Sequence, residues 1–182
     1  MKVIPVIVAF SIEGETLKIV QCVNLKCNLN LGIDFKVAIP HVTLWMGFVQ
    51  EKQLSILENE FNRAFKNVEL TLNFVGIELF DGVSGKVLSA TVSKERSLLL
   101  LQNKVYHFFE PHRVKPFTHD KVDELTLNYI NSFGEKSLKR YEPHVTLGFS
   151  EVCLPMAMGD FIVSAPKIYL AGNNCTCLEV IG

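Results

Sequence analysis

The sequence predicts an α+β fold built from two related halves. The pentapeptide Pro-His-Val-Thr-Leu occurs twice, at residues 40–44 and 143–147, and Gly-Phe follows each copy within a few residues. A strand-like segment and an amphipathic helical segment precede the pentapeptide in each half, so the order of elements recurs as well. Hydrophobic residues make up 48% of the 182 residues, which favours a filled core over disorder. The sequence contains no polar linker long enough to separate independent domains, so we expect residues 1–182 to form one domain.

The first half begins with an apolar run at Val3–Phe10, whose length suits a buried strand. Ser11 can cap a helix that extends to about Leu31, where Gly32 would end it, because hydrophobic residues recur between them at three- and four-residue steps. The segment Glu51–Lys66 predicts another helix, since its apolar side chains form one stripe. The members of this stripe are Leu54, Leu57, Phe61 and Phe65.

The middle of the chain predicts a hairpin followed by a helix. Residues 68–80 and 86–92 are strand-like, and the turn-rich linker between them favours direct antiparallel pairing. A strongly apolar helix is then expected to reach from Leu98 to Phe109. Pro111 would break it and start a loop.

The second half predicts one more helix before the repeated pentapeptide and two strands after it. The helix is expected from Asp120 to Phe133, and Gly134 would end it. The two strands are expected at about 162–170 and 176–181. The helical side chains expected to face inward are Val122, Leu125, Tyr129, Ile130 and Phe133.

Each copy of the pentapeptide is predicted to be a strand, because its residues and flanks are β-branched or aromatic and proline suits the first position of a strand. Side chains alternate between the two faces of a strand, so His41 shares a face with Thr43, and His144 shares one with Thr146. The Val and Leu of each copy point toward the core. An imidazole that titrates near neutral pH can move a proton, and a neighbouring hydroxyl can hold a phosphate oxygen.

Retention of both outward residues favours a function over a purely structural repeat. A duplicated scaffold would keep the inward apolar positions and let the outward positions diverge. Here the His and the Thr are identical in both copies.

With these two motifs the chain resembles the 2H phosphoesterase superfamily, which includes 2′-5′ RNA ligase-like proteins and cyclic nucleotide phosphodiesterases. That superfamily has two His-x-Thr/Ser-x motifs, which His41–Leu44 and His144–Leu147 match without departure. The resemblance implies a two-lobed, pseudo-twofold α+β fold with antiparallel sheets flanked by helices and a central cleft. It also implies catalysis by His41, Thr43, His144 and Thr146 without a metal or another cofactor.

The activity expected from the motifs is that of a metal-independent phosphodiesterase acting on RNA-type phosphates. The substrate would carry a 2′,3′-cyclic phosphate, a 2′-5′ linkage or a related cyclic phosphate, and one histidine would act as base and the other as acid. The reverse reaction, RNA ligation, is an alternative. Another alternative is a module that binds nucleotides or RNA ends with little turnover. A further alternative is a purely structural domain.

Six further residues are candidate substrate contacts by their chemistry alone. The loop at 110–119 gathers cations, an aromatic residue and histidines that could hold a phosphate, although a solvated surface loop has the same composition. Aromatic residues near the motifs could stack on a base, although most such residues belong to the core. The candidates are Phe10, Trp45, Arg113, Lys115, Arg140 and Tyr141.

Charge and cysteine content limit the partners and the compartment. A net charge of −1 argues against binding a long nucleic-acid tract and favours a nucleotide or short oligonucleotide. The apolar run at Val3–Phe10 is too short to span a membrane, so we expect a cytoplasmic protein, and we expect it to be a monomer. An odd number of cysteines, 5, predicts free, buried thiols rather than disulfides or a zinc site. They are Cys22, Cys27, Cys153, Cys175 and Cys177.

Overall fold

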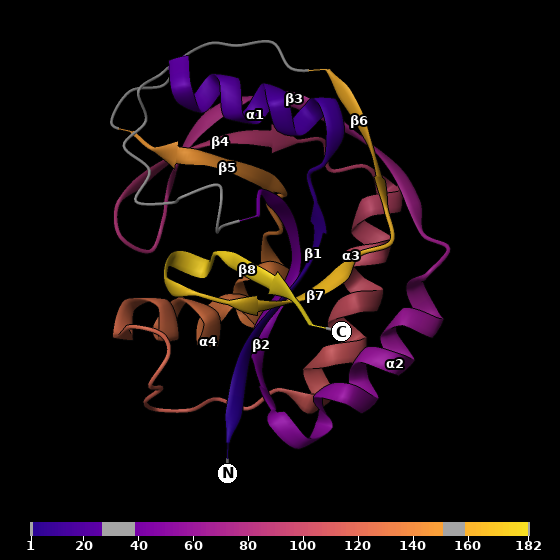
Figure 1. Cartoon of the computed structure of the whole chain (residues 1–182), viewed down its shortest axis with the longest axis vertical. Coiled ribbons are helices and arrows are strands. Elements are labelled where there is room, and N and C mark those ends of the chain that lie inside the picture. Colours follow the sequence, from indigo (N-terminus) through magenta and orange to yellow (C-terminus); the bar gives the residue numbers. More distant parts are fainter. Residues whose placement is uncertain (1, 27–38, 151–158, 182) are drawn as a thin grey trace.

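The computed structural model describes residues 2–26, 39–150 and 159–181, and its strands form two four-stranded antiparallel sheets (Figure 1). One sheet has the order β2-β1-β7-β8 and the other the order β5-β4-β3-β6. The helices are α1 (Gly14–Lys26), α2 (Leu54–Phe65), α3 (Arg96–Phe109) and α4 (Glu124–Lys139). The strands are β1 (Val3–Ser11), β2 (His41–Gln50), β3 (Glu69–Asp81), β4 (Lys86–Val92), β5 (His144–Phe149), β6 (Asp160–Ser164), β7 (Lys167–Ala171) and β8 (Cys177–Val180).

Both pentapeptide strands lie at the edges of their sheets, and they contact each other. β2 pairs only with β1, and β5 pairs only with β4, among the strands of the described residues. The strands β2 and β5 also contact each other, although they belong to different sheets. This arrangement is the two-lobed α+β fold with antiparallel sheets that the sequence predicts.

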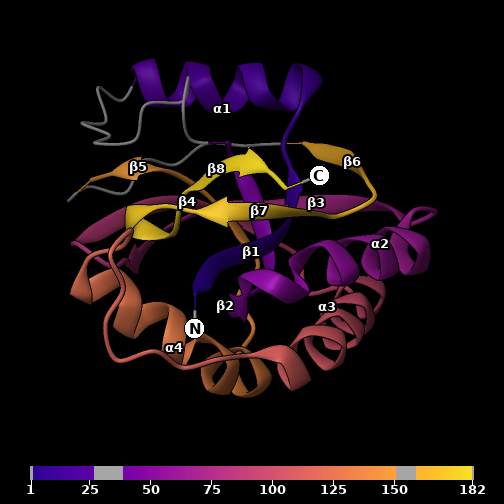
Figure 2. The same ribbon diagram turned by 60° about the horizontal axis from the view of Figure 1, so that its bottom comes forward.

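The helices of each half pack on the strand that carries the other half's motif. The helix α1, which connects β1 to β2, packs against β5. The helices α3 and α4, which connect β4 to β5, pack against β2. Figures 1 and 2 show α1 on one side of the molecule and α3 and α4 on the other, with both sheets between them. Each motif strand is thus backed by elements of both halves.

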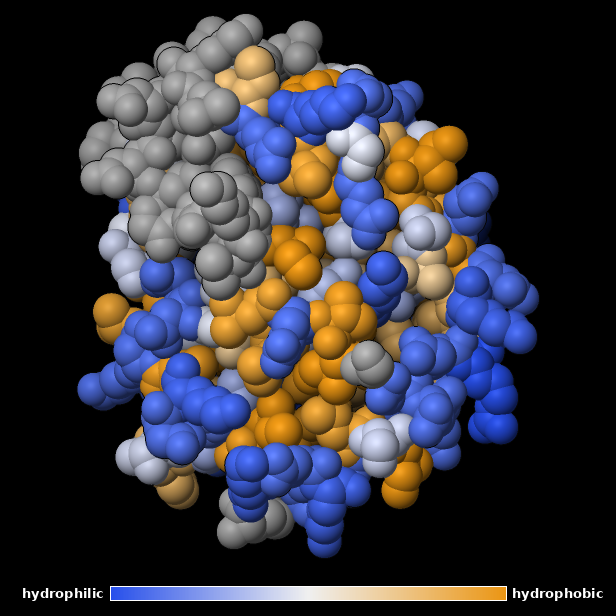
Figure 3. All heavy atoms as spheres, in the orientation of Figure 1, coloured by the Kyte–Doolittle hydropathy of each residue, from blue (hydrophilic) through white to orange (hydrophobic). Residues whose placement is uncertain are grey.

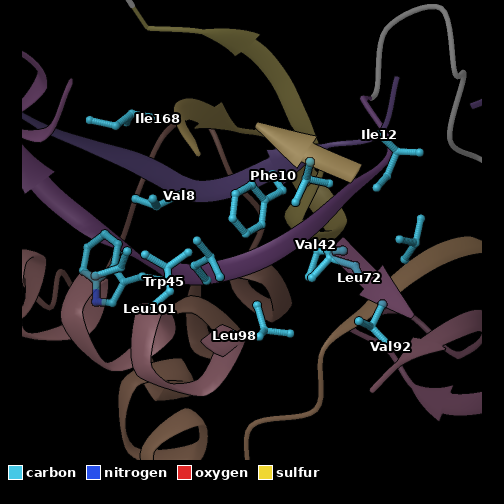
Figure 4. Close-up of a cluster of buried hydrophobic side chains, with 14 of the residues drawn as sticks. Val8, Phe10, Ile12, Val42, Trp45, Leu72, Val92, Leu98, Leu101 and Ile168 are labelled. Atoms are coloured by element: carbon cyan, nitrogen blue, oxygen red, sulfur yellow. The ribbon is translucent and has the colours of Figure 1, made fainter. Parts of the chain in front are cut away.

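A large hydrophobic core joins the two sheets to α2 and α3. The predicted stripe on α2 is confirmed, because Leu57, Phe61 and Phe65 are buried. The Phe61 ring lies 5.4 Å from that of Phe109 and 5.7 Å from that of Phe108, measured between centroids. Figure 4 shows the neighbouring part of this core, where side chains of β1, β2 and α3 meet.

Helix α4 begins and ends later than the sequence predicts. Asp123, rather than Asp120, caps it, because the Asp123 carboxylate accepts a 2.7 Å hydrogen bond from the amide of Thr126. Gly134 lies inside the helix and does not end it. A Cβ at Gly134 would lie 2.6 Å from a guanidinium nitrogen of Arg113, so this glycine makes room for the arginine. Leu125, expected to face inward, is 60% exposed.

Two other expectations need correction. Ser11 ends β1 instead of capping α1, which starts at Gly14; the expected helix end near Leu31 and Gly32 lies outside the described residues. The single strand expected at 162–170 is divided into β6 and β7, because Pro166 cannot donate a ladder hydrogen bond.

The predicted buried thiols are found only in part. Cys22 is exposed, Cys175 is half-buried and Cys177 is buried, and all three are free; Cys27 and Cys153 lie outside the described residues. Among the described helices, none combines the length and the apolar character that crossing a membrane requires.

We expect Phe61→Ala to lower the free energy of unfolding by about 3–5 kcal/mol, because it removes a buried ring that contacts three others. Urea denaturation followed by circular dichroism measures this change. Asn62→Ala, at an exposed position of the same helix, is the control. A loss below about 1 kcal/mol for Phe61→Ala would contradict the assignment of α2 to the core.

Candidate active site

The two motif strands carry the same β-bulge at the same motif position. Between β1 and β2, Val8 is opposite Trp45 and Ala9 is opposite Thr43, so Leu44 is the extra residue. Between β4 and β5, Leu88 is opposite Gly148 and Ser89 is opposite Thr146, so Leu147 is the extra residue. A bulge bends its strand and redirects the side chains around it. The repeated pentapeptide therefore specifies a repeated local distortion next to each His-x-Thr.

The backbone around the two histidines is also equivalent. The Pro40 carbonyl accepts a 2.9 Å hydrogen bond from the amide of Ile12, which directly follows β1. In the other half, the Pro143 carbonyl accepts a 2.9 Å hydrogen bond from the amide of Val92, at the end of β4. Proline has no amide hydrogen to donate, but its carbonyl can accept. In each half the proline carbonyl therefore adds one hydrogen bond to the strand pairing, just before the histidine.

Each imidazole is held by the backbone two residues before it. The Nδ1 atom of His41 lies 2.8 Å from the carbonyl oxygen of Ile39, and Nδ1 of His144 lies 2.8 Å from that of Glu142. A carbonyl only accepts, so Nδ1 carries the proton in both rings and Nε2 is left as the basic nitrogen. Both rings therefore have the same tautomer, with Nε2 available for proton transfer.

One cavity of about 700 Å³ contains both motifs. His41, Thr43, His144 and Thr146 all line it, so each imidazole has a hydroxyl from its own strand beside it. The remaining walls come from the β3–β4 hairpin, from α4 and from the segment around η3 (Asn173–Cys175). The alternation predicted from the sequence thus places the four outward residues together.

Burial disfavours the protonated form of both imidazoles. Burial lowers the pKa of His41 to about 4; the Ile39 hydrogen bond opposes this shift, and the nearby His144 adds to it. Burial also lowers the pKa of His144, but here the backbone hydrogen bond and the carboxylate of Glu142 both oppose the shift. The acid Glu142 is therefore the charge that distinguishes the second imidazole from the first.

Phe80 covers one face of the second imidazole. Its ring stacks on His144 with 4.9 Å between centroids and 18° between planes. The ring restricts the orientation of His144 and removes water from that face, which accounts for part of the burial that lowers its pKa. No pattern in the sequence pointed to Phe80, because it lies on β3, far from either motif in the chain.

Tyr141 connects the two motifs directly. Its hydroxyl donates a 2.7 Å hydrogen bond to the carbonyl of Thr43, 98 positions away in the sequence. Its ring also packs against the main core, and burial raises its pKa well above the ordinary range. Tyr141 also lines the cavity, and its hydroxyl holds β2 beside the second motif.

Three residues predicted as substrate contacts have side chains that are buried away from the cavity. Phe10 and Trp45 are each 0% exposed and lie in the core (Figure 4), where Trp45 stacks on Phe109. The Arg113 side chain is 4% exposed and does not line the cavity. Its guanidinium bonds the Glu110 carboxylate at 2.8 Å and the Met46 carbonyl at 3.1 Å, which is the role of an internal cross-link.

The remaining two candidates differ in position. Lys115 does not line the cavity, so its predicted contact is not supported. Arg140 does line it, and its Nε lies 2.6 Å from the Glu142 carboxylate. Within the described residues, no group of three or more His, Cys, Asp or Glu side chains could hold a metal ion.

Most of the cavity wall that α4 supplies was not predicted from the sequence. Tyr129, Phe133, Lys136 and Lys139 line the cavity together with Arg140. Their helical spacing was visible in the sequence, but the hydrophobic members were assigned to the core. Periodicity identifies the shared face of a helix and does not say whether that face meets a core or a cavity.

The family model described as the 2′-5′ RNA ligase superfamily matches residues 26–158, which include both motifs. No curated protein matches the sequence.

Solved structures with the same fold cover nearly the whole chain. Escherichia coli LigT, crystallised with NADP+, has a TM-score of 0.58 and 14% identity, over 100% of this chain and 96% of LigT. The protein TT0787 of Thermus thermophilus has a TM-score of 0.62 and 14% identity, over 98% of this chain and 95% of its own. At such identities the likeness shows the fold.

We expect Tyr141→Phe to lower the free energy of unfolding by about 0.5–1.5 kcal/mol, because the Thr43 carbonyl loses a buried donor. The variant should also reduce kcat more than it changes KM, because the first motif is no longer tied to the second. Urea denaturation and steady-state kinetics, performed well below the melting temperature, measure the two effects. Unchanged kcat would show that the bond serves stability alone.

Proposed function

We propose that this chain, a member of the 2′-5′ RNA ligase superfamily, is a 2H phosphodiesterase that opens or cleaves RNA-type phosphates by two-histidine acid–base catalysis. The substrate class comprises 2′,3′-cyclic phosphates, 2′-5′ linkages and related cyclic phosphates. His41 and His144 transfer protons, and Thr43 and Thr146 bind the phosphate.

The equivalent anchoring of the two imidazoles carries this proposal. Each Nδ1 is bound by a backbone carbonyl, and both rings line one cavity, so two Nε2 atoms face one reaction space. A purely structural repeat has no need for two matched tautomers beside a cavity. A displacement at phosphorus needs both a base for the attacking oxygen and an acid for the departing one.

The reaction uses the four motif side chains in defined roles. One neutral Nε2 takes a proton from a water or ribose hydroxyl as its oxygen bonds to phosphorus. The protonated second imidazole gives its Nε2 proton to the ribose oxygen as the bond from that oxygen to phosphorus breaks. The hydroxyls of Thr43 and Thr146 donate hydrogen bonds to the non-bridging oxygens, where negative charge increases. Each positioned proton transfer contributes about 10²–10⁴-fold.

An electrostatic difference between the halves supports an assignment of the roles. Burial lowers the pKa of His41 to about 4, and the nearby His144 disfavours a proton on His41 further. The Glu142 carboxylate favours a proton on His144. We therefore assign His41 as the base and His144 as the acid, and we expect a bell-shaped dependence of kcat/KM on pH.

A nucleotide ligand agrees with the cavity and with what the related structures hold. Escherichia coli LigT has been crystallised with 3′-AMP and with ATP. The present cavity combines hydroxyls, imidazoles, aromatic rings and cations, which suit a phosphate, a ribose and a base. Ligation is the second candidate function, favoured by the family's name, because the same four groups would catalyse the reverse transfer to a 5′-hydroxyl.

We expect His41→Ala and His144→Ala each to reduce turnover by at least about 10²-fold while the fold persists. The assay screens 2′,3′-cyclic nucleotides and 2′-5′ oligoadenylates with EDTA present, and identifies which oxygen carries the phosphate in each product. His107→Ala is the control, because His107 is exposed on α3 and does not line the cavity. A folded His41→Ala or His144→Ala variant with full turnover would remove that residue from the mechanism.

We expect Glu142→Gln to move the alkaline limb of the kcat/KM profile to lower pH. The carboxylate favours protonated His144, so its removal lowers the pKa of the acid, which then loses its proton earlier as pH rises. The acidic limb, set by His41, should move less. Glu78→Gln also neutralises a carboxylate that lines the cavity, and it is the control. A shift of the acidic limb alone would reverse the assigned roles.

A further inference from the structure

Two residues of β4 that carry hydroxyls lie beside the second motif. In the pairing of β4 with β5, Thr91 is opposite His144. Ser89 is opposite Thr146 in the same pairing. Directly opposed residues of an antiparallel pair share one face of the sheet, with Cβ atoms about 4.5–5.5 Å apart. The intervening Ala90 is buried in the main core on the other face, so Ser89 and Thr91 lie on the face that carries the motif side chains.

These two hydroxyls differ in how they are satisfied. The Thr91 hydroxyl donates a 2.9 Å hydrogen bond to the carbonyl of Gly76. The Ser89 hydroxyl has no hydrogen-bond partner in the part of the chain that the structure describes, and Ser89 is 0% exposed. Figure 3 shows hydrophilic residues at the surface of one face of the molecule, where water can satisfy them. A buried hydroxyl without a partner opposes folding, so the presence of Ser89 requires an explanation.

The first half of the chain shows that packing does not require this hydroxyl. In the pairing of β1 with β2, Ala9 is opposite Thr43. Ala9 and Ser89 each follow the register shift at the bulge of their own pair, so the two positions are equivalent. Ala9 is also 0% exposed. A small buried residue is therefore sufficient beside the motif threonine, and the serine adds a polar group that the fold does without in the other half.

The neighbours of Ser89 across the sheet are Thr146 on β5 and Glu78 on β3. Both neighbours line the cavity, whereas Ser89 does not, so the serine can act on a ligand only through one of them. Glu78 is exposed, and water can hydrate its carboxylate. Thr146 is half-buried, and its hydroxyl has one proton to donate and two lone pairs to accept with. Staggered rotamers of two opposed side chains can bring their oxygens within hydrogen-bonding reach.

From these observations we propose that Ser89 is a positioning residue that orients the Thr146 hydroxyl toward the phosphate. With a phosphate in the cavity, the Ser89 hydroxyl donates a hydrogen bond to the Thr146 oxygen, and the Thr146 proton is then directed at a non-bridging phosphate oxygen. Thr43 receives no equivalent hydrogen bond from β1, because the side chain of Ala9 has no donor. This inference rests on the proposed function, because it requires Thr146 to bind the phosphate.

The variant Ser89→Ala gives the second half the residue that the first half has. We expect kcat for 2′,3′-cyclic AMP to fall about three- to tenfold, as for the loss of one neutral hydrogen bond. KM should change less, because the contact to the non-bridging oxygen strengthens in the transition state. The midpoint of urea denaturation should stay the same or rise, because an unpartnered buried hydroxyl is removed. Ser164→Ala removes an exposed hydroxyl from β6 of the same sheet, away from the cavity, and it should change neither quantity.

A double-mutant cycle tests whether Ser89 acts through Thr146. In a Thr146→Val background, Ser89→Ala should have no further effect on kcat/KM, because the hydroxyl that it orients is already absent. In a Thr43→Val background, Ser89→Ala should cause the same fold-loss as in the wild type. The first motif therefore serves as the matched control for the second.

Three results would overturn the positioning role. One is a Ser89→Ala variant with full kcat. Another is an equal loss in the wild-type and Thr146→Val backgrounds, which would assign the hydroxyl to Glu78 instead. The third is a loss of kcat accompanied by a lower denaturation midpoint, which would make the role of Ser89 structural.

The affinity for adenosine 3′-monophosphate, measured by calorimetry, separates this inference from the proposed function. If the wild type turns over no cyclic phosphate, catalysis is refuted, and the contact to phosphate is measured by binding alone. Ser89→Ala should then weaken the affinity about threefold in the wild type and leave it unchanged in Thr146→Val. An affinity that Ser89→Ala does not weaken would overturn the positioning role, and no binding by the wild type would refute both proposals.

Discussion

The meeting of two edge strands is the constraint on which the rest of this structure depends. β2 and β5 each pair with one strand of their own sheet, and they contact each other at the boundary between the two sheets. An open strand edge is normally a liability, because unpaired backbone groups invite association. Here the two edges enclose a cavity, and the hydroxyl of Tyr141 donates to the Thr43 carbonyl on the open side of β2. The exchange of helices between the halves then holds both motif strands against elements of the opposite half.

Equivalent geometry does not give equivalent chemistry. The bulges at Leu44 and Leu147 and the Nδ1 contacts of the two histidines are the same in both halves. The surroundings are not, since Phe80 stacks on His144 and Glu142 lies beside it. Residues outside the repeat therefore give the two imidazoles different electrostatic environments.

The loss of three predicted contacts has a common physical cause. Aromatic and arginine side chains can bind nucleotides, but in this fold those of Phe10, Trp45 and Arg113 are used for packing and for internal hydrogen bonds. The two aromatic residues fill the space between β1, β2 and α3 (Figure 4). Arg113 supplies donors to the Met46 carbonyl and to the Glu110 carboxylate, and Gly134 leaves the space for it. Side-chain type indicates what a residue could bind, whereas burial decides whether a ligand can reach it.

The sequence by itself determined the repeated strands, the outward placement of each histidine and threonine, the α+β class and the stripe on α2. These features follow from the two-residue repeat of side-chain direction in strands and the 3.6-residue repeat in helices, and both repeats can be read without knowing distant contacts. The family resemblance implied one cleft for both motifs, whereas the tertiary structure alone decided that Tyr141 joins them and that α4 continues through Gly134 to line the wall. Those features depend on residues far apart in the chain, such as Tyr141 with Thr43 and Gly134 with Arg113. Their packing energy exceeds the local preference of a glycine or a tyrosine, so local patterns could not reveal them.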